Sequence, residues 1–259
     1  MTGALFDTWY IVLRDLKARI RMPVFIFISL FQPILWLVLF TQIFKTLGAS
    51  ISSVIGAGIS YRDYFAPGVI IMTVLFSSAF SGFATLMDID AGILPKMLAT
   101  PVTRVSIITG RVIATVLVGV IQALIVFIVA TIMGVHVATG APGVLLILLL
   151  ASLLGIGFSA FSNGLALLLR RQETVMAVIN LITMPLMFMS SMMMPPQSLP
   201  HWLDTVRHFN PVDYAIVGAR NLMLTGYVWS DLWKSLVVLC AFAVVMVAFG
   251  TMMFRTRAE

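Results

Sequence analysis

Long apolar stretches separated by short polar segments dominate this sequence. A helix needs about 20 apolar residues to cross about 30 Å of hydrocarbon, because each residue rises about 1.5 Å. Strands of a membrane barrel would alternate polar and apolar residues over about ten positions, and these stretches do not. The pattern predicts an all-α polytopic membrane protein, one domain over residues 1–259. Its six predicted transmembrane helices are 24–44, 65–86, 105–135, 143–169, 174–194 and 232–254.

Three segments outside these spans carry their own pattern. Residues 1–23 place apolar side chains at helical spacing with basic residues mostly off that stripe, which predicts an interfacial amphipathic helix. Residues 87–104 predict a short amphipathic helix between spans 2 and 3. Residues 195–230 predict short interfacial or partly re-entrant helices between spans 5 and 6. The apolar stripe of the first segment is Leu5, Trp9, Val12, Leu13, Leu16 and Ile20.

Composition and charge support this fold and orient it. The chain is 61% hydrophobic and 10% charged, with a mean hydropathy of +1.08, far beyond what one soluble core needs. With six spans, eleven of the 16 Lys and Arg residues fall on the side of the two chain ends. Basic residues are retained in the cytoplasm, so we expect both termini there and a multi-pass location in the cytoplasmic (inner or plasma) membrane. Nucleic-acid binding is not needed to explain the basicity.

Several kinds of chemistry lack their sequence signature. No Gly-Lys pair occurs, so the chain has no Walker A loop. HExxH, CxxC and GxSxG are absent as well, and we expect neither an enzymatic site nor a metal site. All ten acidic residues fall outside the predicted spans or at their rims, which disfavours an ion-coupled carrier. Inside span 4, a run of small residues around Gly157 and Ala160 predicts a close-packing face.

One region resembles a known family. The stretches YFAPGVIIMTVLF and MDIDAGILPKMLATPVTRVSIITGR, within residues 64–111, are similar to permease subunits of type-2 ABC exporters, especially the daunorubicin-resistance branch. The similarity rests on Pro67 and Gly68 opening span 2, then Gly92, Pro101 and Arg104. Six spans, an N-terminal surface helix and an external Asn-Pro pair fit as well, so the resemblance covers nearly the whole chain.

The resemblance implies partners and a coupling site. Residues 87–104 would be a coupling helix that docks into a separate ABC nucleotide-binding subunit, which would bind ATP and Mg, and the N-terminal helix would lie near that subunit. A second permease copy or homologue would complete the path, giving two permeases and two ATPases. The alternative is that rim charges simply anchor the spans. The expected coupling residues are Asp88, Asp90, Gly92, Leu94, Lys96, Leu98, Pro101 and Arg104.

The same resemblance places the substrate path on spans 2 and 5. Each span carries a stripe of side chains, rich in Met and Phe, that would suit apolar ligands; packing against other helices or lipid is the alternative. The external segment would close the outer end, with Pro195, Pro196, Asn210 and Pro211 as gate residues. The path residues are Met72, Phe76, Phe80 and Phe83 in span 2, and Asn180, Met184, Met187 and Ser191 in span 5.

The resulting functional expectation is a transport subunit without its own ATPase site. The resemblance implies an ATP-driven exporter of hydrophobic drugs or lipid-like molecules. One alternative is the permease of an exporter of lipid-linked glycans, and another is an ATP-independent secondary carrier or membrane scaffold.

Overall fold

A computed structural model of the chain describes residues 2–21, 23–46, 59–100, 102–193, 195 and 200–257. Regular structure within these ranges is helical throughout. The helices are α1 (Thr2–Ile20), α2 (Pro23–Thr46), α4 (Tyr61–Ala79), α5 (Gly82–Asp90), α6 (Ile93–Leu98), α7 (Arg104–Ile132), α8 (Gly140–Leu169), α9 (Gln172–Phe188), α10 (His201–Arg207), α11 (Pro211–Leu224) and α12 (Trp229–Arg257).

Five segments are long and apolar enough to cross a membrane: 26–44, 61–90, 104–132, 140–169 and 229–256. The segment predicted as a sixth span, 174–194, corresponds to α9, which has only 17 residues. At about 1.5 Å per residue, α9 falls short of about 30 Å of hydrocarbon. The all-helical prediction is therefore confirmed, whereas the count of six spans is not.

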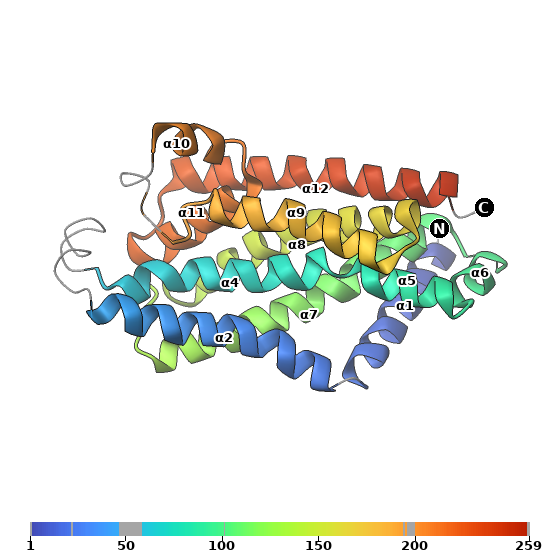
Figure 1. Ribbon diagram of the computed structural model, residues 1–259, viewed down its shortest axis with the longest axis horizontal. Helices are drawn as coiled ribbons and strands as arrows, with labels where there is room; N and C mark the ends of the chain where they lie inside the picture. Colours follow the sequence, from blue (N-terminus) through green and yellow to red (C-terminus); the bar gives the residue numbers. More distant parts are fainter. Residues whose placement is uncertain are drawn as a thin grey trace.

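The helices form an elongated bundle with two different ends (Figure 1). The beginning of α1, the α5–α6 segment and the end of α12 lie together at one end. It is here called the coupling end because it holds the residues that the sequence predicts to couple to an ATPase subunit. Helices α10 and α11 lie at the opposite, outer end. Residues 87–104, which were expected to form one coupling element, are divided between the last turn of α5 and the six-residue α6.

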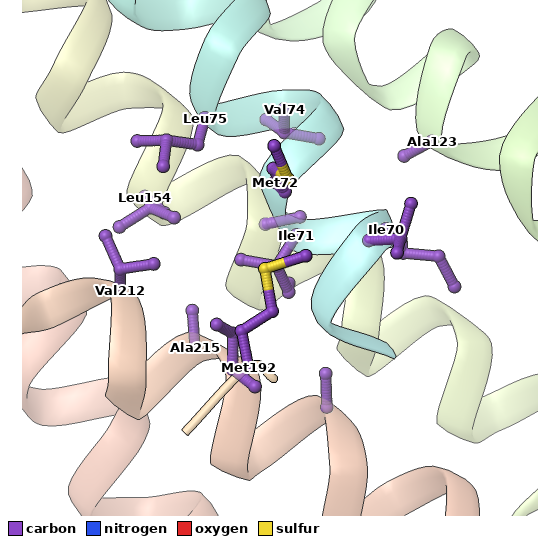
Figure 2. Close-up of a cluster of buried hydrophobic side chains, with 14 of the residues drawn as sticks. Ile70, Ile71, Met72, Val74, Leu75, Ala123, Leu154, Met192, Val212 and Ala215 are labelled. Carbon is purple, nitrogen blue, oxygen red and sulfur yellow. The ribbon is translucent and has the colours of Figure 1, made fainter. Parts of the chain in front are cut away.

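Helix α4 is the centre of the bundle and packs against α2, α7, α8 and α11. Its side chains from Tyr64 to Leu75 are all buried, and Figure 2 shows Ile71 beside Met192. The helix begins earlier than expected, so Pro67 and Gly68 lie inside it rather than at its start. Gly68 is needed there because a Cβ would lie 2.7 Å from Met192 Cγ.

Small residues bring α8 and α12 into close contact, as the sequence predicts. A Cβ on Gly157 would lie 2.4 Å from the Phe242 ring, and one on Gly164 would lie 3.0 Å from Phe249. Gly250 of α12 approaches the backbone of Ala160 at 2.7 Å by the same measure. The small-residue run in α8 is therefore a helix-packing face.

Helix α1 packs along α7 instead of presenting its whole apolar stripe to lipid. Val12 is buried, and Ile11 contacts α7 at Gly110, where a Cβ would lie 2.8 Å away. Leu5, Trp9 and Ile20 stay exposed. The predicted stripe is thus divided between a face against the bundle and a face suited to the membrane surface.

Candidate functional site

The coupling end is built around a break in the second long segment. Helix α4 ends at Ala79 and α5 begins at Gly82, so α5 forms a separate arm. At the far end of this arm, Gly92 adopts a left-handed conformation with φ +66° and directly precedes α6. Because L side chains rarely adopt that conformation, glycine permits the sharp turn between α5 and α6.

Two arginines from other helices hold the Asp88 carboxylate of this arm. Arg111 of α7 is paired with Asp88 Oδ2, and Arg14 Nη2 of α1 lies 2.6 Å from Asp88 Oδ1. Arg14 also donates to Met97 Sδ of α6 at 3.0 Å. The Arg111 side chain is only 2% exposed and that of Asp88 14%. Since a buried charge is costly unless it is paired, this triad fixes the arm to both α1 and α7.

Another acidic side chain, Asp15 of α1, lies beside this triad. Asp15 is buried, and its burial raises the pKa of the carboxyl despite the opposing effect of Arg111 and Arg14. Arg19, one turn further, donates to Thr115 Oγ1 of α7 at 2.8 Å. Helix α1 is therefore attached to α7 by polar contacts as well as by apolar packing.

The remaining predicted coupling residues divide into anchored and exposed ones. Leu94 is buried in a cluster with Ile11, Ile107 and Phe254, and Leu98 packs against that cluster. Asp90 and Lys96 are exposed, although Asp90 Oδ2 accepts from Gln172 Nε2 at 3.3 Å. The α6 helix therefore has one face on the bundle and one face open for a partner.

The other two predicted coupling residues lie beyond α6. Arg104 begins α7 and donates from Nη1 to the Arg255 carbonyl of α12 at 2.8 Å. Pro101 lies outside the described residues. Whether any of the eight residues touches an ATPase subunit stays a prediction.

The predicted path residues differ in their exposure. Met72 of α4 is buried. Phe76 of α4 and Phe80, which directly follows that helix, stack with ring centroids 6.2 Å apart and are half-buried, as is Phe83 of α5. On α9 and just beyond it, Met187 and Ser191 are buried, but Met184 is 42% exposed.

Asn180 is half-buried and donates to the Met176 carbonyl of its own helix at 3.0 Å. A path between the two stripes remains a prediction.

At the outer end, Asn210 joins α9 to α11. Its Oδ1 accepts from the Val212 backbone N–H at 3.0 Å and caps α11, with Pro211 in the first turn. Its Nδ2 donates to the Leu186 carbonyl of α9 at 2.6 Å. One side chain thus satisfies groups at the end of one helix and the start of the next. Of the other predicted gate residues, Pro195 is buried and Pro196 lies outside the described residues.

A buried arginine adds further contacts at the outer end. Arg220 of α11 donates from Nη2 to the Ser191 carbonyl at 2.7 Å and lies over the Tyr64 ring, 3.7 Å from its centroid. Asp213 of the same helix accepts from the Ser191 backbone N–H at 2.7 Å and pairs with Arg207 at 3.2 Å. Ser191, one of the predicted path residues, connects the segment after α9 to α11.

Arg111 and Arg220 were not among the predicted site residues, although the sequence contains a signal for both. Arg111 falls within the predicted span 105–135, and Arg220 within the apolar run 214–224. An ionisable residue inside an apolar segment is expensive and therefore usually has a buried partner. Both were counted only among the basic residues that orient the chain. Their partners lie elsewhere in the sequence, Asp88 for Arg111 and Tyr64 and Ser191 for Arg220.

Replacing Asn210 by alanine is expected to lower the free energy of unfolding by about 1–2 kcal/mol, because a helix cap and a bond to α9 are lost together. Equilibrium unfolding of the purified chain in mixed detergent micelles measures this. Asn180→Ala is the matched control, since Asn180 bonds only within its own helix at Met176. Equal effects of the two substitutions would contradict the capping role.

Comparison with known proteins agrees with this architecture. A family model described as ABC-2 type transporter matches residues 7–224. The chain is 27% identical over 203 residues to the putative transport permease ycf38 of Cyanophora paradoxa, covering 78% of this chain and 69% of that protein. It is 24% identical over 242 residues to the daunorubicin resistance ABC transporter permease protein DrrB1 of Streptomyces coeruleorubidus, covering 93% and 82%. Because the family model spans most of the sequence, the chain belongs to the ABC-2 type transporter family, as a membrane permease of an ABC transporter.

Proposed function

We propose that this chain is the permease subunit of an ATP-driven exporter that moves hydrophobic drugs or lipid-like molecules outward across the cytoplasmic membrane. The family implies partnership with an ABC ATPase subunit. The observation that carries the proposal is the α5–α6 arm, which is fixed to the bundle through Asp88 and keeps Asp90 and Lys96 exposed. A soluble partner that binds such an arm could move it, and the contacts of Asp88 would transmit this movement to the helices.

The proposed topology has six crossings and both chain ends in the cytoplasm. Helix α9 would be the sixth crossing, because it runs along the bundle from the coupling end toward the outer end (Figure 1). Its 17 residues are extended by the buried segment from Ser190 to Met192, which is bonded to α11 through Ser191. Protein, rather than lipid, would then surround the non-helical part of this crossing, as non-helical backbone at membrane depth requires.

The proposed cycle uses nucleotide-driven movement of the arm. ATP binding would close two ATPase subunits and shift α5–α6 together with the helices that Asp88 joins. A second permease copy would complete the path, and the outer closure around Asn210 and Arg220 would open to release the cargo. ATP can drive this change only by its different affinity for the two states of the complex.

An apolar cargo suits the side chains that α4, α5 and α9 offer. Phe76, Phe80 and Phe83 are half-buried, and Met184 is partly exposed. Met and Phe side chains adapt to varied apolar ligands. The name of DrrB1 points the same way. A lipid-linked glycan would instead favour a wide path lined with aromatic and polar groups.

Two measurements test the proposal. The chain, expressed with an ABC ATPase encoded beside it, is expected to retain that subunit through purification in mild detergent. Vesicles containing the pair should move a fluorescent apolar cation or a lipid probe only when ATP is present. Purification without any ATPase would overturn the proposal, and ATP hydrolysis without transport of either probe would overturn the cargo.

Replacing Gly92 by proline is expected to remove most ATP-driven transport while the chain still inserts, because proline cannot adopt φ +66° and the α5–α6 turn would change direction. Gly226→Pro is the matched control at the outer end. Gly226 also has a positive φ, +103°, and both glycines donate one backbone hydrogen bond, Gly92 to Ile89 and Gly226 to Asn221. Comparable transport by the two variants would remove the α5–α6 turn from the coupling site.

A further inference from the structure

The break between α4 and α5 is bridged by a side chain from α8. In a continuous helix the Gly82 N–H would bond the carbonyl four residues earlier. Here the Gly82 N–H donates to Ser162 Oγ at 2.9 Å, and the Ser162 hydroxyl donates to the Ala79 carbonyl. Ser162 is fully buried, so without its hydroxyl both backbone groups would be left unpaired away from water.

A second polar residue of α8, Asn163, connects this break to the Asp88 triad. Asn163 Nδ2 donates to Ser81 Oγ in the break at 3.1 Å and to the Ser159 carbonyl at 2.7 Å. Its Oδ1 accepts from the Thr85 hydroxyl of α5. Thr85 Oγ1 in turn accepts from Arg111 Nη1 at 2.9 Å.

These bonds share one direction. The Arg111 guanidinium donates to Thr85, Thr85 donates to Asn163, and Asn163 donates to Ser81. Each of these side chains is at most 4% exposed. Asn163 is the junction, because it accepts from the arm and donates to the break. A carboxylate or an alkyl group there could not do both.

The close approach of α5 to α8 makes these bonds geometrically specific. A Cβ on Gly82 would lie 2.4 Å from the Ser162 carbonyl oxygen, so the two helices touch at backbone distance. The break itself contains no proline, since it consists of Phe80 and Ser81. Its interruption is therefore stabilised by α8 rather than imposed by ring geometry.

We propose that Ser162 and Asn163 are positioning residues that set the angle of the α5–α6 arm to α4, so that the arm and α8 move as one body. The part of this proposal that concerns coupling to transport rests on the proposed function. The part that concerns the angle of the arm does not, because it depends only on contacts within this chain. If α8 served only as a packing surface, removing one hydroxyl oxygen from Ser162 would leave the arm in place.

Spin-label distances in the full chain test the geometric role. Labels replace Lys96 on α6 and Leu149 on α8, both exposed, in a Cys240→Ser background that removes the only cysteine. The sample is a lipid nanodisc, with unlabelled chain added to suppress distances between copies. The unsubstituted arm is expected to give one narrow distribution. In Ser162→Ala, the population of arms at distances outside this narrow peak should rise by about fivefold, the change in equilibrium expected from the loss of one net hydrogen bond.

Ser152→Ala is the matched control, because Ser152 lies on the same helix and bonds only its own backbone at Leu148. It should leave the distribution unchanged. Asn163→Ala should broaden the distribution further. If that variant does not fold, Ser81→Ala removes one side of the same junction. Distributions for Ser162→Ala and Ser81→Ala that match the unsubstituted arm would overturn the proposal.

The complex with the ATPase adds a readout that a purely structural role would not change. Ser162→Ala should retain the ATPase and hydrolyse ATP at a rate near that of the unsubstituted complex, with about fivefold less cargo moved per ATP. An unchanged ratio would overturn the role in coupling. If no ATPase is retained, the proposed function fails, whereas the nanodisc distances still decide how the arm is positioned.

Discussion

Replacing Asp88 by asparagine is expected to lower the free energy of unfolding by about 3 kcal/mol, near the lower end of the cost of breaking a buried ion pair. Asparagine keeps the shape of the side chain but leaves the Arg111 charge without its counter-ion. Arg111 is 2% exposed, and its Nε has no hydrogen-bond partner among the described residues. The lower end applies because Asp88 itself retains 14% exposure. Equilibrium unfolding in mixed micelles gives the difference.

Asp15→Asn is the control for this substitution, because it makes the same chemical change beside the same arginines. Burial raises the pKa of Asp15, so its charged form is not well stabilised there. We expect a change of less than about 1 kcal/mol, typical of a position where charge contributes little. A similar decrease in the free energy of unfolding for both variants would show that total charge stabilises this end, rather than the ion pairs of Asp88.

Replacing Gly82 by alanine is expected to destabilise the chain by about 3 kcal/mol, the upper range for overpacking in a well-packed core. The added Cβ would lie 2.4 Å from the Ser162 carbonyl oxygen and 2.9 Å from its carbon. Because these are backbone atoms, α5 and α8 must separate, and the bond from Gly82 N–H to Ser162 would lengthen. This outweighs the gain of about 1 kcal/mol that alanine brings to a helix.

Gly119→Ala separates steric cost from helix propensity. Gly119 lies inside α7, where the nearest atom to an added Cβ is Val74 Cγ1 at 3.3 Å, part of a side chain that can yield. We expect unchanged or slightly higher stability, because the helix preference of alanine then dominates. Both variants are measured by the same unfolding titration. A loss at Gly119 as large as that at Gly82 would contradict the close backbone contact between α5 and α8.

The break between α4 and α5 could not be predicted from the local sequence pattern. Phe80 and Ser81 fall inside a continuous apolar stretch, and the sequence predicts one uninterrupted span there. The break depends on Ser162, which lies 80 positions from Gly82. No local pattern identifies that partner. Gly92 was among the predicted coupling residues, but its left-handed turn was not predicted, because residues 87–104 were expected to form one short helix.

The surroundings of the predicted stripes on spans 2 and 5 could not be predicted from the sequence either. Helical spacing places Met72, Met184 and Met187 on their helix faces, but it does not say what each face touches. In the structure Met72 and Met187 are buried in the core, and Met184 is exposed. Ser191 lies beyond the end of α9 and is held by Arg220.

By itself, the sequence determined the helical class and five of the long apolar segments, because a helix that crosses lipid needs a long apolar run. It also indicated the family, through the short motifs around Pro67, Gly92 and Arg104. Only the tertiary structure decided which charges pair, where span 2 breaks and which residues join α9 to α11 at the outer end. Asp88 with Arg14 and Arg111, Gly82 with Ser162, and Ser191 with Arg220 are each far apart in sequence. Helix packing brings them together, since a buried polar group is stable only beside its partner.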